Sequence, residues 1–216
     1  MTITIDKTKT HTVYKTEDGK RVCGVTTILN VLNKPALVNW ANRIGLEGIE
    51  VGKYVDQKAN IGTLVHAFIM SHFKNEDVDT SDFTAKEIAQ AENSLLSFFE
   101  WLKSNPIEPI LIETPLVSET YSYGGTPDIL GKINGDLILL DFKSGSGIYE
   151  EAYYQVCAYR QLLIEQGHEI KKARILNIPR AETEEFQEKQ FSDFEVGWQI
   201  FLHCLGIYNL KKKTGK

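Results

Sequence analysis

The chain has no long apolar run and contains only three cysteines in 216 residues. A membrane-spanning helix needs about 20 apolar residues in succession, so we expect neither a membrane span nor a membrane partner. The first residues also have no apolar core of the kind found in signal peptides. Cys23, Cys157 and Cys204 are widely spaced, which favours neither a disulfide framework nor a cysteine metal cluster. The expected compartment is therefore a reducing cytoplasm.

The chain also has no excess of basic residues, and its net charge is −5. Proteins that bind nucleic acid without preference tend to be basic, and this chain is not. The balance still allows a protein that contacts phosphates only locally. The basic run Lys211–Lys213 is typical of a solubilising tail.

The composition is ordinary for a globular protein, with 42% apolar and 25% charged residues. The length suits a single domain over residues 1–216, and the chain has no internal repeat or low-complexity tract. Helices are predicted over Thr27–Leu32 (with Thr26 as the cap), Ala36–Ile44, Gly52–Phe73, Thr84–Lys103, Ile148–Gln166 and Phe194–Leu210. Strands are predicted over Thr2–Ile5, His11–Tyr14, Pro109–Ser118, Ser122–Ile133, Asp136–Phe142 and Ala173–Ile178.

This order of elements predicts an α/β (α+β) fold. Three consecutive strands form an antiparallel meander, and a helix then leads to a further strand. Residues 137–140 are apolar at every position, as in a strand buried on both faces. We therefore expect a central mixed β-sheet flanked by helices.

The most informative segment is the hairpin at residues 126–143. Asn134-Gly135 is a strong signal for a two-residue turn, because both positions need a positive φ. Counting outward from this turn places Asp128 opposite Asp141, with their Cβ atoms roughly 5 Å apart. Their repulsion would be about 3 kcal/mol at an effective dielectric constant near 20, and a divalent cation would relieve it. Lys143 follows Asp141 on the same face of the strand.

An ion-pair network at the end of the sheet is the alternative explanation of Asp128, Asp141 and Lys143.

Further candidate site residues are weaker when each is taken alone. Gln155 and Tyr159 lie four residues apart on one face of a helix that would pack near Lys143. A core tyrosine beside a solvated glutamine would give the same pattern.

His66 is a possible metal ligand, although a lone helical histidine is more often structural. Gly62, one turn earlier, would let another segment approach closely. Either Glu113 or Glu119 could add a carboxylate, as a ligand or as a base that orients water. The sequence does not choose between them, and Glu113 is kept as a minor candidate because its position would allow it to point toward the same end of the sheet.

Four short motifs together resemble the PD-(D/E)XK nuclease superfamily. They are Gly62-Thr-x-x-His66, Gly125-Thr-Pro-Asp128, Asp141-Phe-Lys143 and Gln155-x-x-x-Tyr159, in the order and approximate spacing of that family. The resemblance is to the branch with RecB-type nuclease domains and lambda-type phage exonucleases. It implies a restriction-endonuclease-like core over residues 60–180. Residues 1–55 and a C-terminal helix over 190–210 would then be additions.

The resemblance also implies a metal site. His66, Asp128 and Asp141 would bind Mg²⁺ or Mn²⁺, together with the backbone carbonyl of Phe142. Asp141 stands where the family more often has glutamate, a change that the family permits. Some relatives carry an iron–sulfur cluster on four cysteines, and three scattered cysteines argue against a cluster here.

The same resemblance gives Lys143, Gln155 and Tyr159 catalytic roles. Lys143 would position the attacking water and stabilise charge on the phosphate. Gln155 and Tyr159 would support the site and contact DNA. The sequence has no phosphate-binding loop of the type Gly-x-x-x-x-Gly-Lys-Ser/Thr, so a helicase or recombination partner would be a separate chain. A homo-oligomer is a further possibility.

The leading hypothesis is a divalent-metal-dependent deoxyribonuclease of phage or bacterial DNA recombination, repair or degradation. An exonuclease is favoured, because so short a chain has little left for reading base sequence. The alternative is a catalytically silent nuclease fold that binds DNA or another protein. Such a module has no need to keep the complete set of His66, Asp128, Asp141 and Lys143, so the set favours the enzyme.

Overall fold

The centre of the molecule is a five-stranded mixed sheet with the strand order β11-β10-β9-β8-β5. The computed structural model describes residues 2–4, 12–181 and 184–215. The five strands are β5 (Ile107–Ile112), β8 (Ile129–Ile133), β9 (Asp136–Lys143), β10 (Lys172–Asn177) and β11 (Gln187–Phe191). β5, β8 and β9 form the expected antiparallel meander, and β10 runs parallel to β9. The predicted central mixed sheet is confirmed.

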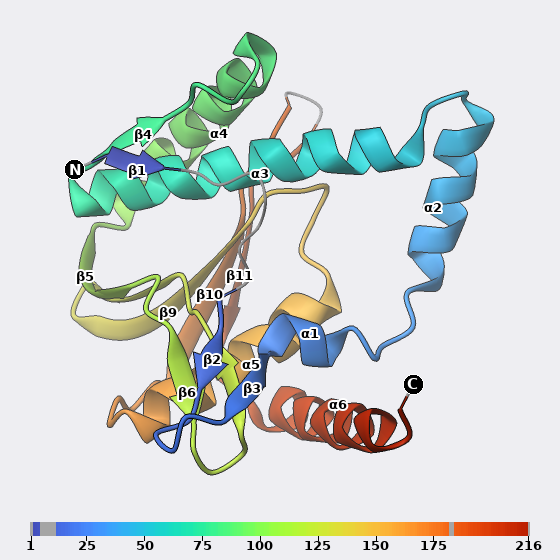
Figure 1. Cartoon of the computed structure of the whole chain (residues 1–216). Coiled ribbons are helices and arrows are strands. Elements are labelled where there is room, and N and C mark those ends of the chain that lie inside the picture. Colours follow the sequence, from blue (N-terminus) through green and yellow to red (C-terminus); the bar gives the residue numbers. More distant parts are fainter. Residues whose placement is uncertain (1, 5–11, 182–183, 216) are drawn as a thin grey trace.

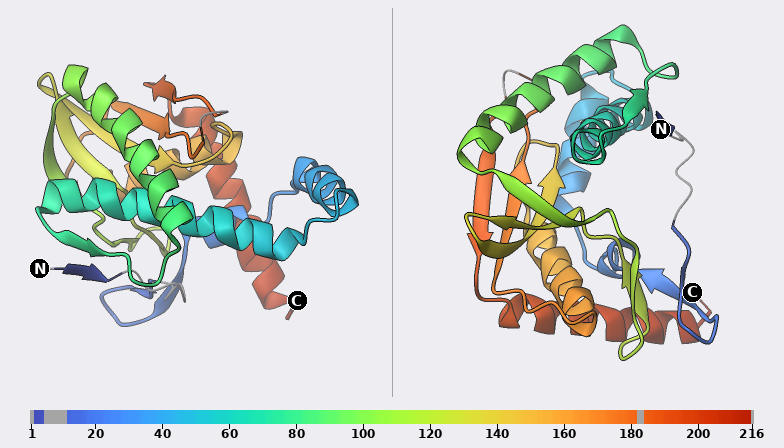
Figure 2. Two further views of the ribbon diagram at one scale, coloured as in Figure 1. Left: turned by 90° about the horizontal axis from the view of Figure 1, so that it is seen from above. Right: turned by 90° about the vertical axis from the view of Figure 1, so that its left-hand side faces the viewer.

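Helices cover both faces of this sheet (Figures 1 and 2). The helices are α1 (Val25–Leu29), α2 (Pro35–Leu46), α3 (Val51–Lys74), α4 (Ala85–Ser104), α5 (Glu150–Glu165) and α6 (Glu195–Lys213). Ile138 and Leu140 of β9 are buried in a cluster with α3 and α4, whereas Leu139 is buried against α1, α5 and α6. Alternate residues of the apolar segment 137–140 therefore pack into two separate cores, as expected for a strand buried on both faces.

Smaller sheets complete the fold. One has four strands in the order β2-β3-β7-β6, and a parallel pair joins β1 to β4. Their bounds are β1 (Thr2–Thr4), β2 (Tyr14–Lys15), β3 (Arg21–Gly24), β4 (Asp77–Asp79), β6 (Leu116–Ser118) and β7 (Tyr123–Gly125). No helix in the described part of the chain has both the length and the apolar character that a bilayer crossing requires.

Two of the predicted strands are wrong as single elements. The predicted strand Pro109–Ser118 is split into β5 and β6, and Ser122–Ile133 is split into β7 and β8, in different sheets. The first break contains Glu113 with a φ of 42°, a left-handed conformation that no strand continues through. The second contains Pro127, which has no N–H to donate to a ladder.

Other boundaries differ locally. β3, β4 and β11 were not predicted, because they are short or polar edge strands. The first predicted helix begins earlier and has Gly24 rather than Thr26 at its N-cap. The predictions for Ile5 and His11 fall outside the described residues. By contrast, α4 begins as predicted, with a capping box between Thr84 and Glu87.

The apolar residues of the helix predicted over residues 36–44 are mostly not buried. α2 is present as a helix, and Ile44 is buried, but the side chain of Leu37 is 55% exposed. The pattern indicated a helix correctly, yet this helix covers little of the core.

Candidate functional site

The hairpin has the predicted register. Ile133 pairs with Asp136, and Asn134 and Gly135 have φ values of 52° and 85°. The ladder continues to the pair Ile129 and Leu140, so Asp128, just before β8, lies level with Asp141. The candidate site therefore forms at the carboxyl end of β9, between α3 on one face and α5 on the other.

Asp141 is a charged side chain in the core, with only 1% of its surface exposed. Its Oδ2 lies 2.6 Å from Nζ of Lys143, but within the described residues this oxygen has no well-directed hydrogen bond. Burial raises the pKa of the Asp141 carboxyl to about 6, Lys143 opposes the rise, and the charge of Asp128 adds to it. Burial, rather than the predicted repulsion by Asp128, is the larger destabilising effect.

Asp128 is partly satisfied by the backbone of β9. Its Oδ2 accepts a hydrogen bond from the N–H of Phe142 at 2.6 Å. This contact joins the segment before β8 to the carboxyl end of β9, and the other oxygen, Oδ1, faces His66.

Lys143 is held in place by a short chain of hydrogen bonds to α5. Its Nζ donates to Oε1 of Gln155 at 3.0 Å, and Nε2 of Gln155 donates to the hydroxyl of Tyr159 at 2.6 Å. Tyr159 is buried, and burial together with the nearby carboxylates raises its pKa well above the ordinary value. It therefore stays a neutral hydroxyl at any working pH.

His66 approaches the same point from α3. Its Nε2–H donates to the carbonyl of Phe142 at 2.9 Å, and Nδ1 lies 3.8 Å from Oδ1 of Asp128. With the proton on Nε2, the lone pair of Nδ1 faces a carboxylate oxygen. A proton or a cation between these two acceptors would make the arrangement favourable.

Two glycines allow this convergence. A Cβ on Gly62 would come 2.6 Å from the hydroxyl of Ser144, the residue after Lys143, so a side chain rather than another backbone approaches this glycine. A Cβ on Gly125 would come 2.6 Å from the ring of Tyr159. The hydroxyl of Ser144 can rotate away, but the ring of Tyr159 has little room, so a larger residue at position 125 would displace Tyr159.

The two glutamates have different surroundings. The backbone N–H of Glu113 donates to the carbonyl of Asp128 at 2.8 Å, but its carboxylate pairs with Lys74 at 2.9 Å. Glu119 lies in the turn between β6 and β7, and its carboxylate accepts a hydrogen bond from the backbone N–H of Glu17. The structure thus brings the backbone of Glu113 to the site and leaves Glu119 in the smaller sheet.

Residues that the sequence did not single out also border the site. Tyr14 shares a hydrogen bond of 2.9 Å with Thr126, and its ring fills the space left by Gly124. Asn177, opposite Lys143 on β10, is buried and donates to the carbonyl of Gly145 at 3.0 Å. No sequence pattern could have joined residues 14 and 126, which lie 112 positions apart.

The donor set suits a hard divalent cation. Two carboxylates, a backbone carbonyl and an imidazole converge, and Oδ2 of Asp141 is a buried acceptor with no directed hydrogen bond. Among the described residues, no three acidic, histidine or cysteine side chains already form a preassembled metal cage. Lys143 and the N–H of Phe142 hold some of the carboxylate oxygens, so a cation would enter by displacing these contacts.

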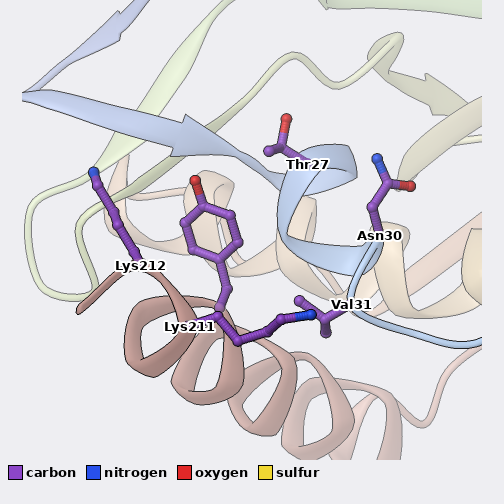
Figure 3. A pocket seen from close by; sticks show the side chains of 6 residues that line it. Thr27, Asn30, Val31, Lys211 and Lys212 are labelled. Atoms are coloured by element: carbon purple, nitrogen blue, oxygen red, sulfur yellow. The ribbon is translucent and has the colours of Figure 1, made fainter. Parts of the chain in front are cut away.

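A separate hollow of about 280 Å³ lies between the region of α1 and the end of α6 (Figure 3). Figure 3 shows Thr27, Asn30 and Val31 on one side and Lys211 and Lys212 on the other. None of the candidate catalytic residues lines it.

The chain matches no family model and no curated protein sequence. It is similar in structure to a protein from Eubacterium rectale provisionally named an exonuclease, with 14% identity and a TM-score of 0.49 over 70% of this chain. This chain covers 65% of that protein, slightly less than two thirds of its length.

The alkaline exonuclease LHK-Exo from Laribacter hongkongensis is similar at 11% identity, with a TM-score of 0.36 over 70% of this chain and 83% of that one. A complex of LHK-Exo with dAMP matches at 12% identity and a TM-score of 0.35, over 74% of this chain and 91% of that one. Likenesses of this degree assign no function, so the function of this chain has to be inferred from its own residues.

Proposed function

We propose that this protein is a divalent-metal-dependent deoxyribonuclease of the PD-(D/E)XK type, acting as an exonuclease on DNA. One observation carries the proposal. Residues from separate parts of the chain converge at the carboxyl end of β9: His66 of α3, Asp128 just before β8, Asp141 and Lys143 of β9, and the Gln155–Tyr159 pair of α5. An accidental set of motifs has no reason to meet at one point.

The ligands of Mg²⁺ or Mn²⁺ would be Asp128, Asp141 and the carbonyl of Phe142, with His66 beside them. A bound cation of this kind polarises a phosphoryl oxygen and lowers the pKa of a coordinated water. The buried carboxylate of Asp141 costs free energy without a cation, and that cost supports a site built to receive positive charge.

Lys143 would orient the attacking water and stabilise negative charge on the phosphate. Gln155 fixes the ammonium group through its Oε1, and Tyr159 fixes the amide of Gln155. Because Gln155 and Tyr159 lie one turn apart on a packed helix, the position of Nζ is set before substrate arrives.

The runner-up is a catalytically silent nuclease fold that binds DNA. The hydrogen bond between Lys143 and Gln155 favours the enzyme, because a binding module gains nothing from orienting this amine. An ion-pair network without chemistry would account for the contact between Asp141 and Lys143 but gives no reason for His66 and Gln155 to meet them at the same point.

The test is cleavage of a linear DNA duplex with EDTA, Mg²⁺ or Mn²⁺ by the wild type and by Asp141→Asn. A matched control is Asp136→Asn, at the other end of the same strand, where an exposed aspartate pairs with Lys172. We expect metal-dependent cleavage by the wild type and the control, and none by Asp141→Asn. Tight DNA binding without cleavage by the wild type would instead support the silent module.

A further inference from the structure

α2 stands apart from the rest of the molecule (Figures 1 and 2). Beside the N-terminal end of α3 it forms an arm that extends away from the sheets. The side chains of Leu37 and Val38 are 55% and 68% exposed, and Leu46, at the end of the helix, is 82% exposed. A helix with so little buried surface contributes little to the core, so its sequence calls for another explanation.

Two aromatic rings meet where this arm joins α3. Trp40 of α2 and Tyr54 of α3 have ring centroids 5.9 Å apart, tilted by 52°, and both are only half-buried. Nζ of Lys58 lies 5.6 Å from the centre of the Tyr54 ring. Arg43 lies three residues after Trp40, on the same side of α2. Within the described residues neither Arg43 nor Lys58 has a carboxylate within 4 Å, although the charge of Lys58 helps to lower the pKa of the Glu184 carboxyl.

Both ends of the arm are joined to helices that carry the candidate site. Along α3, Tyr54, Lys58 and Gly62 precede His66 at intervals of four residues. At the other end, Lys34 pairs with Glu151 of α5 at 3.5 Å, one turn before Gln155. The rise of a helix separates Tyr54 from His66 by about 18 Å, which is the length of about five stacked nucleotides.

Aromatic rings interleaved with cations are the usual platform for an unpaired nucleic-acid strand. Bases stack on the rings, while lysine and arginine attract the phosphates. A second copy of this chain would account for Leu37 and Val38 but gives no reason for Arg43 and Lys58 beside the aromatic pair. The charge of these two cations complements a strand and favours it as the occupant.

We propose that Trp40, Arg43, Tyr54 and Lys58, the arm surface, hold an unpaired stretch of the DNA strand and guide it toward His66. The identity of the strand as DNA rests on the proposed function. The strand's bases stack on Trp40 and Tyr54, and its phosphates lie against the two cations. A base stacked there lies about five nucleotides from the reacting phosphate.

The test measures binding of a fluorescent oligothymidylate by anisotropy in EDTA, so that no cleavage occurs. Trp40→Ala and Tyr54→Ala are each expected to raise Kd by about 5- to 100-fold, and Trp40→Phe by much less. Leu46→Ala, on the same helix, is the matched control and is expected to bind like the wild type. Circular dichroism checks that each variant retains its helices.

The outcomes separate this inference from the proposed function. Cleavage of DNA is measured separately in Mg²⁺, where the wild type is expected to cleave and Lys143→Ala is not. If the wild type binds the oligonucleotide through Trp40 and Tyr54 but never cleaves DNA, the proposed nuclease function is wrong, and the arm surface is still supported as a strand-binding site. If Trp40→Ala and Tyr54→Ala bind as tightly as the wild type, the arm surface is wrong. Light scattering that shows these variants lose self-association, with no change in Kd, would make a second copy the occupant.

Discussion

At the scale of single residues, the site depends on a carboxylate that the core disfavours. Asp141 is buried on the face of β9 that packs against α5, and Lys143 is its nearest cation. The ammonium group of Lys143 is ion-paired with Asp141 and donates a hydrogen bond to Gln155, so it contacts both side chains. The stability and the chemistry of the protein therefore meet in the same few atoms.

The contribution of Asp141 to the metal-free stability is expected to become less favourable as pH rises between about 4 and 6. The pKa of Asp141 is raised from 3.8 to about 6, so in this window the folded state holds a proton that the unfolded chain has released. At pH 7 this group is expected to cost about 2–3 kcal/mol. Asp141→Asn removes the cost, so urea unfolding in EDTA at pH 7 should show a variant at least as stable as the wild type.

The same comparison at pH 4 serves as the control, since both proteins then carry a neutral side chain at position 141. Their difference in unfolding free energy should be small at pH 4 and grow toward pH 7. A variant that is less stable than the wild type at pH 7 would contradict a net cost of burying the Asp141 carboxylate beside Lys143.

Gln155→Leu is expected to reduce kcat by about 10- to 100-fold, the usual effect of removing a group that orients a catalytic one. The side chain keeps a similar volume but can no longer accept from Lys143 or donate to Tyr159. Steady-state kinetics on linear DNA, with Gln161→Leu on the same helix as control, measures the change. An unaltered kcat would mean that the orientation of Lys143 does not depend on Gln155.

Much of the site could be predicted from sequence because the Asn134-Gly135 turn fixes the register of the hairpin. Once that turn is known, Asp128, Asp141 and Lys143 follow by counting. The neighbours that depend on long-range folding could not be found this way. Tyr14 reaches Thr126 through the smaller sheet, and the burial of Asp141 depends on how α5 packs.

At the scale of elements, glycine contacts decide how closely the helices approach the sheet. Gly125, at the end of β7, faces the ring of Tyr159 on α5. Its φ is not in the left-handed region, so the constraint is space rather than backbone conformation. The packing of β7 against α5 thereby sets where Tyr159 stands.

Gly125→Ala is therefore expected to lower the free energy of unfolding by about 1–3 kcal/mol, because its Cβ overlaps an aromatic ring that has little room to move. Gly52→Ala in α3 is the matched control, since no atom lies within 4 Å of the new Cβ. The control should be more stable than the wild type by about 0.5–1 kcal/mol. Equal effects in a urea titration would show that space around Gly125 is not limiting.

Helices and strands with a clear hydrophobic pattern were predictable. Strands whose limits depend on a change from one sheet to another were not. The capped helix α4 and the apolar strand β9 have unambiguous patterns. The strands that change from one sheet to another look continuous in sequence, because the break at Glu113 depends on a backbone conformation. β11 is polar because it lies at the edge of its sheet, so no apolar alternation marks it.

At the scale of the whole molecule, the central sheet separates two cores and holds the site at one end of β9. α3 and α4 cover one face, and α1, α5 and α6 cover the other (Figure 1). His66 comes from the first layer and the Gln155–Tyr159 pair from the second, so the site exists only when both layers are packed. The arm of α2 extends beside this site without belonging to either core.

The most direct test of the proposed exonuclease compares a linear duplex with a covalently closed circle of the same sequence. Both are incubated with Mg²⁺ or EDTA and with the wild type, Lys143→Ala, or the control Lys172→Ala, an exposed lysine of β10. We expect loss of the linear DNA only, in Mg²⁺ only, with the wild type and the control but not with Lys143→Ala. Cutting of the circle, or cleavage that survives in Lys143→Ala, would contradict an exonuclease acting through this site.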